Sequence, residues 1–338
     1  MGYQIQIKSF NEQLNKLSEH YRIFAPRLYK GAGAYSDSDR IEYGEIQKIE
    51  DIEFDKKSDF SFKEVLFPQS EVLFYFTEDD IKEASIKPKG NIIFLRSCDL
   101  HGVKRFDDIY LKNGYEDHYY ARLREKTKFI LMGCRESFEN CFCVDMETNQ
   151  CNEYDAYIEL DGESVKIDSH WEALDASFLD EAKEVTVLPK YVLKNKIQVD
   201  IPEKIELEEV LKLPLWEEYN ARCIACGRCN FVCPTCTCFT MQDIFYKENG
   251  RVGERRRVWA SCHVDGYTDM AGGICFRQSK AERMRFKVMH KISDYKKRFG
   301  VHMCVGCGRC DDVCPEYISF SNSINKLNDA LSKERAVK

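Results

Sequence analysis

Eight of the seventeen cysteines of this 338-residue chain fall into two runs with the same spacing. Residues 223–234 have the sequence Cys-Ile-Ala-Cys-Gly-Arg-Cys-Asn-Phe-Val-Cys-Pro, and residues 304–315 have the sequence Cys-Val-Gly-Cys-Gly-Arg-Cys-Asp-Asp-Val-Cys-Pro. In proteins with this spacing, three cysteines of a run ligate one [4Fe-4S] cluster and the fourth ligates the other cluster. The runs therefore predict two [4Fe-4S] clusters.

The predicted ligand sets exchange one cysteine between the runs. Cluster site 1 is predicted to consist of Cys223, Cys226, Cys229 and Cys314. Cluster site 2 is predicted to consist of Cys304, Cys307, Cys310 and Cys233. Zinc also binds Cys-x-x-Cys pairs, but zinc sites normally stop at four ligands in two pairs. Each run here has a third and a fourth cysteine followed by proline, so iron–sulfur ligation is the favoured prediction.

A third group of cysteines lies outside the runs. Its members are Cys98, Cys134, Cys141 and Cys143. Cys98 and Cys134 each follow a predicted strand, and a right-handed crossover between those strands would bring both cysteines to one sheet edge. With the other two on the adjoining loop, the group predicts a possible third [4Fe-4S] cluster. A zinc site and simple burial of free cysteines remain as alternatives.

The other cysteines receive weaker interpretations. Cys236 and Cys238 are expected to pack against the second cluster or to donate weak S–H hydrogen bonds to its sulfides. Cys151 is expected to have no function. His263 is expected to be a packing residue rather than a ligand or proton carrier. No role is assigned to Cys262 and Cys275.

Hydrophobic periodicity predicts the elements that position these residues. Residues 1–30 are predicted to be helical, because Phe10, Leu14, Leu17 and Tyr21 recur at helical spacing. Residues 102–111 have a second helical pattern. Short runs of β-branched and aromatic residues predict strands at 72–76, 91–95, 128–132, 156–160, 164–167 and 185–188.

The length of the chain predicts two domains. Residues 1–215 would form an N-terminal α/β domain with the possible third cluster, and residues 216–338 a helical dicluster ferredoxin-like domain. The 70 residues between Cys233 and Cys304 predict an insertion in that second domain. The predicted fold class is therefore α+β, with an N-terminal mixed α/β domain followed by a mainly helical two-[4Fe-4S] ferredoxin-like domain.

Charge is distributed unevenly, with a net charge of −14 over residues 1–216 and +7 over residues 217–338. A [4Fe-4S] core with four thiolates is anionic, so nearby basic residues have a role that does not involve nucleic acid. Residues 277–298 predict a basic amphipathic helix, with Met284, Val288 and Ile292 along one face. Its basic face could be solvated, or it could dock an acidic redox partner or the acidic N-terminal domain.

Several classes of protein are excluded. The composition, with 43% hydrophobic and 12% aromatic residues, is that of an ordered globular protein. The N-terminus lacks the apolar core of a signal peptide and the apolar runs are too short to span a membrane, so we expect a soluble, cytoplasmic chain. Dinucleotide, P-loop, nucleophile-elbow and zinc-protease motifs are missing from the sequence. We therefore expect no catalytic residue and no nucleic-acid or membrane partner.

Further motifs carry a family resemblance over nearly the whole chain. They are Arg-Ser-Cys-Asp-Leu-His-Gly-Val from Arg96, Cys-Phe-Cys from Cys141, Cys-Pro-Thr-Cys-Thr-Cys-Phe from Cys233, and Ser261-Cys262 followed by Ala-Gly-Gly from Ala271. Together with the paired runs, they resemble the dicluster iron–sulfur subunit of anaerobic sulfite reductase. The same motifs recur in the beta subunit of cytosolic NiFe sulfhydrogenases, a sister group.

The resemblance implies an electron-relay subunit in a larger enzyme. In the sulfite reductase family, the relay connects an NAD(P)H-oxidising flavin subunit to a siroheme subunit that reduces sulfite to sulfide. We therefore expect an electron-transfer subunit of an anaerobic sulfite reductase complex, with both of those partners. One alternative is the beta subunit of a sulfhydrogenase, and another is a non-redox scaffold with structural clusters.

Overall fold

The computed structural model describes residues 2–34, 37–85, 88–175, 182–248 and 250–337. Within these ranges the chain divides into two compact units, each assembled from separate stretches of sequence. Unit 1 comprises residues 1–68, 82–138 and 148–194, and unit 2 comprises residues 69–81, 139–147 and 195–338. The predicted domain boundary at residue 215 falls inside unit 2. It stays a prediction made from the sequence.

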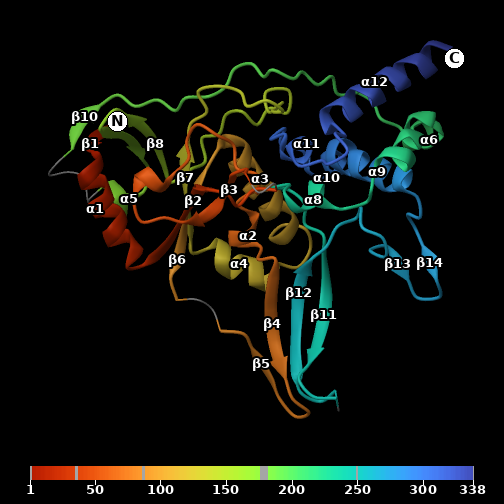
Figure 1. The fold of residues 1–338 in the computed structure, drawn as a ribbon, viewed down its shortest axis with the longest axis horizontal. Coiled ribbons are helices and arrows are strands. Elements are labelled where there is room, and N and C mark those ends of the chain that lie inside the picture. Colours follow the sequence, from red (N-terminus) through yellow and green to blue (C-terminus); the bar gives the residue numbers. More distant parts are fainter. Residues whose placement is uncertain (1, 35–36, 86–87, 176–181, 249, 338) are drawn as a thin grey trace. The chain divides into compact units, whose positions relative to one another are not determined.

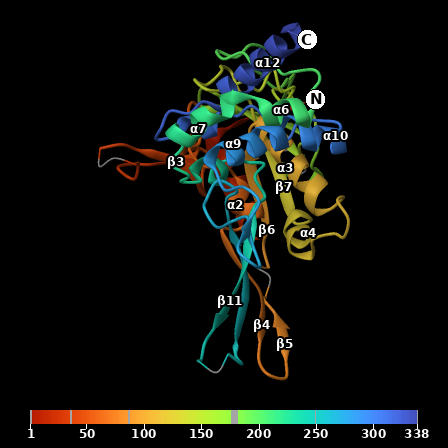
Figure 2. The same cartoon turned by 90° about the vertical axis from the view of Figure 1, so that its right-hand side faces the viewer.

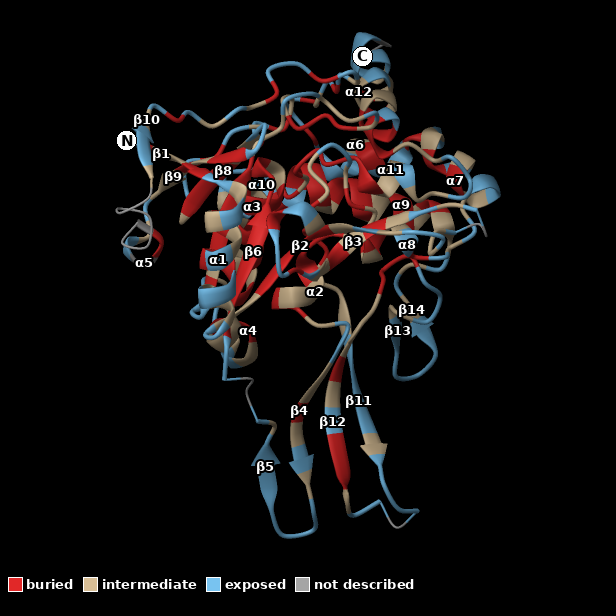
Figure 3. Ribbon diagram, turned by 60° about the vertical axis from the view of Figure 1, so that its left-hand side comes forward, coloured by how far each residue is buried: buried red, intermediate tan, exposed pale blue. Residues whose placement is uncertain are grey.

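Unit 1 contains a mixed β-sheet with the strand order β10-β1-β9-β8-β7-β6-β2-β3 among the described residues (Figure 1). Strands β2, β6, β7 and β8 are parallel neighbours, and the other pairs are antiparallel. The strands are β1 Gly2–Gln6, β2 Tyr21–Tyr29, β3 Arg40–Glu45, β6 Gly90–Leu95, β7 Thr127–Met132, β8 Ala156–Asp161, β9 Ser164–Ser169 and β10 Lys183–Val185. All six residues of β6 are buried, as expected for a central parallel strand covered on both faces (Figure 3).

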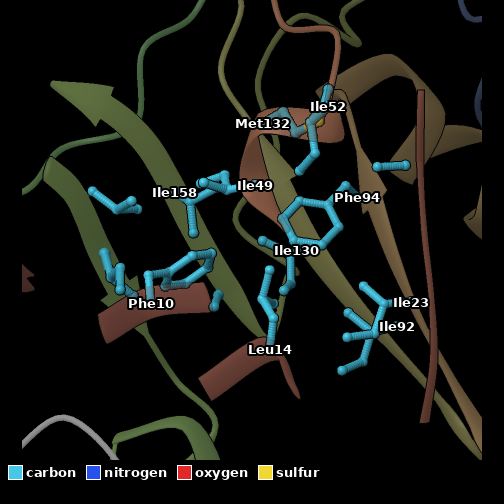
Figure 4. Close-up of a cluster of buried hydrophobic side chains, with 14 of the residues drawn as sticks. Phe10, Leu14, Ile23, Ile49, Ile52, Ile92, Phe94, Ile130, Met132 and Ile158 are labelled. Atoms are coloured by element: carbon cyan, nitrogen blue, oxygen red, sulfur yellow. The ribbon is translucent and has the colours of Figure 1, made fainter. Parts of the chain in front are cut away.

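Helix α1 supplies part of the core of unit 1. Its side chains Phe10 and Leu14 are almost completely buried and pack with apolar residues of the sheet, among them Ile92, Ile130 and Ile158 (Figure 4). A contact between tilted aromatic rings joins helix α3 to α4, where Tyr110 and Tyr120 have centroids 5.2 Å apart. The helices of unit 1 are α1 Ile7–Ser18, the 3-10 helix Ile49–Asp51, α2 Lys63–Leu66, α3 Ser97–Tyr110, α4 His118–Arg124 and α5 Glu172–Asp175.

The β–helix–β prediction is confirmed, because β6 and β7 are parallel and α3 connects them. The prediction that residues 1–30 are helical is wrong outside α1. Residues 21–29 instead form β2, which pairs with β3 on one side and β6 on the other. Much of β2 is buried, so its apolar residues do not alternate with polar ones as in a half-buried strand. The helical spacing of Tyr21 therefore did not reflect a helix. The strand predicted at 185–188 is observed as β10, which ends at Val185 and does not include residues 186–188.

Unit 2 combines helices with strands β11, β12 and β4 of a second sheet, whose order is β11-β12-β4-β5 among the described residues (Figure 2). These strands are β4 Ser70–Phe76, β5 Ile81–Glu83, β11 Phe239–Phe245 and β12 Gly253–Trp259, and a small hairpin joins β13 Asp269–Met270 to β14 Ile274–Cys275. The insertion between the two cysteine runs therefore contains hairpins that the sequence did not predict. Arg255, Arg256 and Arg257 interrupt the apolar alternation of β12, which hid this strand.

The helical part of unit 2 packs around its own apolar core, which includes Trp216, Val288 and Leu327. The helices are α6 Leu207–Lys212, the 3-10 helix Pro214–Trp216, α7 Glu217–Arg222, α8 Arg228–Phe231, α9 Lys280–Met289, the π-helix His290–Asp294, α10 Tyr295–Phe299, α11 Arg309–Asp312 and α12 Phe320–Val337. The predicted basic amphipathic helix is confirmed as α9, the π-helix and α10 in succession, with Met284, Val288 and Ile292 buried.

Candidate metal centre

The two cysteine runs have the same backbone conformation. In each run a loop leads into a short helix, α8 in the first run and α11 at the corresponding place in the second. Gly227 and Gly308 begin these helices in the left-handed region, with φ of 74° and 70°. Two residues earlier, Ala225 and Gly306 have φ of 58° and 61°. The repeat of sequence is therefore also a repeat of backbone shape.

Cluster site 1 is gathered around one cavity in unit 2. Its walls include the thiols of Cys223, Cys226 and Cys229 from the first run and Cys314 from the second. Burial raises the pKa of Cys223, and the thiolates of the other three add to that rise, because like charges disfavour one another. The structure therefore brings the four predicted ligands together, including the one from the opposite run.

Polar groups in the same cavity suit an anionic cluster. The backbone N–H of Ala225 donates to Cys223 Sγ at 3.4 Å, and the N–H of Ile318 donates to Cys314 Sγ at 3.3 Å. His263 also lines this cavity, is only 2% exposed, and its Nε2 has no hydrogen-bond partner in the described part of the chain. An inorganic sulfide or a cysteine sulfur of a bound cluster could accept a bond there, so these residues fit a [4Fe-4S] cluster.

His263 is kept neutral by its surroundings. Burial, together with the positive charges of Lys287 and Arg283, lowers the pKa of its imidazole to about 3. A neutral imidazole has one N–H donor. The expectation that His263 is only a packing residue does not explain its unpartnered nitrogen.

Cluster site 2 is also gathered in unit 2. Burial raises the pKa of Cys304 to about 12, with Cys233 and Cys307 among the thiolates that add to the rise. The pKa of Cys310 is likewise raised by burial and, among others, by Cys307 and Cys233. The N–H of Gly306 donates to Cys304 Sγ at 3.5 Å, the counterpart of the Ala225 bond in site 1. The fourth cysteine of the first run thus lies with three cysteines of the second.

A loop from a distant part of the sequence covers cluster site 2. The N–H of Phe142 donates to the carbonyl of Gly306 at 2.8 Å, and Cys141 Sγ donates to the carbonyl of Cys307 at 3.4 Å. A Cβ on Gly306 would lie 2.5 Å from the carbonyl oxygen of Phe142, and one on Gly308 would lie 2.1 Å from that of Asn140. Both positions therefore need glycine for close packing as well as for φ.

Two buried lysines on the basic helix contact the cluster cysteines. Burial lowers the pKa of Lys287, but thiolates of Cys229 in site 1 and Cys310 in site 2 outweigh it and raise the pKa well above its usual value. Lys291 lies one helical turn on, where burial is outweighed by Cys233 and other thiolates, so its pKa is also raised. Its Nζ donates to Thr235 Oγ1 at 2.7 Å.

Sequence reasoning missed these two lysines. Positions 287 and 291 directly precede the apolar residues 288 and 292, so they lie at the border of the buried face. Lys287 is 4% exposed and Lys291 is 3% exposed. A lysine is almost never fully buried unless it is paired, and thiolates are the anions available here. Their position at the border of the apolar helix face was the only sign in the sequence that these lysines are buried.

The predicted third group is divided between the two units. Within unit 1, Cys98 lies in the first turn of α3 and Cys134 follows β7. Burial lowers the pKa of Arg96, but the nearby Cys134 and Cys98 thiolates raise it above its usual value. Arg96 donates to Cys134 Sγ at 3.4 Å. Within unit 2, Cys141 and Cys143 lie beside the second run, and Asn195 donates to Cys143 Sγ at 3.6 Å. The four-cysteine site stays a prediction.

Cys236 and Cys151 lie in different units. Cys236 is buried and hydrogen-bonds to Cys233, and this bond holds the pKa of Cys233 well below its usual range. Cys236 therefore lies beside Cys233, a ligand predicted for cluster site 2, and its packing against a bound cluster stays a prediction. Cys151 is buried in unit 1 and donates to the carbonyl of Glu153 at 4.0 Å. Among the described residues, no group of three or more His, Cys, Asp and Glu side chains has the spacing to hold a single metal ion.

Comparison with known protein families matches residues 222–318 to the 4Fe-4S dicluster domain. This region contains all eight cysteines of cluster sites 1 and 2. A dicluster domain indicates two [4Fe-4S] clusters, and the fold is the mixed α/β arrangement with a C-terminal dicluster domain that the sequence predicted. None of the described helices is both long and apolar enough to cross a membrane.

The chain is also similar to a curated protein over almost its full length. It is 26% identical over 339 residues to Sulfhydrogenase 2 subunit beta of Pyrococcus furiosus, and the match covers 95% of this chain and 97% of that protein. No solved structure matches the chain. The two likenesses support an iron–sulfur electron-transfer subunit of an oxidoreductase complex, and they favour the sulfhydrogenase side of the resemblance over the sulfite reductase side.

Proposed function

We propose that this chain is the electron-transfer subunit of a complex of the sulfhydrogenase type, in which it passes electrons between partner subunits. The observation that carries the proposal is the composition of cluster site 1, whose cavity is lined by three cysteines of one run and one of the other. Such interlacing is the arrangement of two-cluster ferredoxins. A [4Fe-4S] cluster supplies one-electron chemistry when bound.

The residues of the chain would bind the clusters and set their charge balance. We assign Cys223, Cys226, Cys229 and Cys314 to one cluster and Cys304, Cys307, Cys310 and Cys233 to the other. Lys287 and Lys291 would offset the negative charge of the thiolates, and the N–H groups would donate to sulfur. Burial of both lysines among apolar side chains would keep water from screening their charges.

The partners would contain the substrate sites. The likeness to a sulfhydrogenase beta subunit supports a hydrogen-oxidising partner and a further subunit that exchanges electrons with this chain. A second candidate is the sulfite reductase relay between a flavin subunit and a siroheme subunit. Its support is the set of sequence motifs from Arg96 to Gly273, which both groups share.

The four cysteines Cys98, Cys134, Cys141 and Cys143 are retained as a proposed third [4Fe-4S] site, with zinc as the alternative. Its support is the pairwise placement of the cysteines at the carboxyl ends of parallel strands and beside the second run. Metal analysis tests it. About twelve irons per chain would support a third cluster, about eight irons with one zinc would support the zinc site, and eight irons alone would contradict both.

Purification of the intact complex without oxygen tests the main proposal. Nickel in the complex, with siroheme missing, is the expected result, and siroheme without nickel would replace the proposal with the sulfite reductase candidate. Cys226→Ser and Cys307→Ser should each abolish hydrogen oxidation coupled to the acceptor subunit while sparing hydrogen oxidation with a viologen dye. Cys275→Ser is the matched control. Coupled turnover that survived either change would contradict the relay, as would clusters that dithionite cannot reduce.

A further inference from the structure

Two thiols of unit 2, Cys238 and Cys262, lie next to each other and are not among the eight predicted cluster ligands. The expectation that Cys238 packs against the second cluster stays a prediction. Cys238 immediately precedes β11 and Cys262 follows β12, so both lie at the open end of the same hairpin. The ladder brings this end together, because Phe239 pairs with Trp259 and the N–H of Ala260 donates to the carbonyl of Cys238 at 3.0 Å. The hairpin therefore places Cys238 opposite Ala260, two residues before Cys262, and so brings the two cysteines to the same end of the sheet.

The two sulfur atoms share a hydrogen bond and have different further partners. Cys238 Sγ also accepts from the backbone N–H of Cys262 and from the hydroxyl of Tyr267. Cys262 Sγ accepts from Asn230 Nδ2 at 3.1 Å. Three donors thus converge on Cys238, while Cys262 is the donor between the two thiols.

The surroundings make the two thiols chemically unequal. The hydrogen bond from Cys262, with those from Tyr267 and the Cys262 N–H and the charge of Lys291, lowers the pKa of Cys238 to about 6 against the opposing effect of burial. The same bond, together with burial, raises the pKa of Cys262. Cys238 is partly exposed and Cys262 is only 6% exposed. An accessible thiolate beside a buried, protonated thiol is the arrangement of an attacking cysteine and its resolving partner.

We propose that Cys238 and Cys262 form a redox-active dithiol that undergoes thiol–disulfide exchange with small disulfides. The Cys238 thiolate attacks one sulfur of the small disulfide, forms a mixed disulfide and releases one thiolate. Cys262 then loses its proton to solvent and attacks Cys238 Sγ, which forms the Cys238–Cys262 disulfide and releases the second thiolate. The protein dithiol is oxidised by two electrons, and the small disulfide is reduced to two thiols.

Closing this disulfide requires little movement. The sulfurs are already in hydrogen-bond contact, and rotation of two side chains can bring them to the S–S bond length of about 2.05 Å. None of the eight cysteines assigned to cluster sites 1 and 2 takes part. The site therefore adds a two-electron thiol couple to a chain whose proposed clusters carry single electrons, and it does not depend on which complex contains the chain.

The holoprotein, purified and reduced without oxygen, provides the test, with glutathione disulfide as the probe. After oxidation, free thiols are alkylated and the bonds are located by mass spectrometry. We expect a Cys238–Cys262 disulfide. Cys262→Ser should stop at a Cys238–glutathione mixed disulfide, and Cys238→Ser should form neither species. Cys238 should react about tenfold faster at neutral pH than Cys275, a partly exposed thiol that hydrogen-bonds to Thr268.

Two results would overturn the proposal. One is that Cys238 and Cys262 remain alkylatable thiols after exposure to glutathione disulfide. The other is that Cys238→Ser or Cys262→Ser lowers the iron content relative to Cys275→Ser, since the pair would then be cluster ligands. Neither result bears on the relay, because the relay is tested by electron transfer through sites 1 and 2 and the dithiol by a covalent bond elsewhere.

Discussion

The two cysteine runs share one backbone shape but differ sharply in burial. Ile224, which follows the first cysteine of the first run, is 54% exposed, whereas its counterpart Val305 in the second run is 2% exposed. Cys226 is exposed, whereas its counterpart Cys307 is 7% exposed. Residues 140–142 account for the difference, because they cover the glycines of the second run.

The difference teaches that a repeated motif can serve two separate tasks. Electron transfer weakens with distance, so a cluster near the surface suits exchange with a partner, while an enclosed one suits passage within the chain. Burial disfavours the extra negative charge of a reduced cluster, and cations and N–H donors oppose that effect. Lys291 therefore places its positive charge beside site 2, the more buried of the two cluster sites.

The largest expected effect comes from replacing the fourth cysteine of either run by serine. Cys314→Ser should remove the cluster held by the first run, although the substitution lies in the second, and lower the iron content by about four irons per chain. Cys233→Ser should do the reverse. Alkylation of the freed thiols identifies the damaged run. If Cys314→Ser instead exposed Cys304 and Cys307, the ligand sets would not be interlaced.

Gly306→Ala should damage site 2 next most strongly. The added Cβ would meet the carbonyl oxygen of Phe142 at 2.5 Å, and overpacking against backbone costs on the order of 1–3 kcal/mol. Thermal unfolding and iron content measure the effect. Ala225→Gly is the matched control, since Ala225 already has φ of 58° and the change should cost less than about 1 kcal/mol. Equal losses in the two variants would show that the loop does not enclose site 2.

Removal of buried charge should have an intermediate effect, visible as a change in reduction potential with both clusters retained. A unit charge about 6 Å away at an effective dielectric constant of about 20 contributes roughly 3 kcal/mol, on the order of 100 mV for one electron. Lys291→Met should therefore lower the potential of site 2, and Lys287→Met should lower both. Redox titration followed by electron paramagnetic resonance separates the sites. Lys297→Met, on the exposed side of α10, should change neither potential.

The sequence was sufficient for the parts of the site that depend on local spacing. The interval between cysteines predicted which cysteines would gather at each cluster site. The β6–α3–β7 unit followed from periodicity alone. These features are encoded within a few residues, where the chain geometry leaves few alternatives.

The features that distinguish the two cluster sites depend on long-range contacts. Phe142 reaches Gly306 from a distant part of the sequence, and no periodic pattern records that contact. Lys287 and Lys291 resembled solvated lysines, because their thiolate partners lie on other elements. The strand β12 was hidden because arginines interrupt its apolar alternation, and its pairing with β4 joins segments about 180 residues apart. Tertiary packing, not local preference, determines these positions.

The smallest effect should come from the exposed surface at site 1. Ile224 is half-exposed, and its replacement by Ser removes apolar surface that a partner would cover. The lost burial would cost about 1 kcal/mol of binding free energy, which corresponds to about fivefold weaker association. Electron transfer with the partner subunit should slow by a few-fold at low concentration, while dithionite reduction of both clusters stays unchanged. Val305→Ser places the same change in the enclosed counterpart, where it should reduce stability and cluster content instead. If Ile224→Ser left the partner rate unchanged, the exposed run would not be the face at which electrons are exchanged.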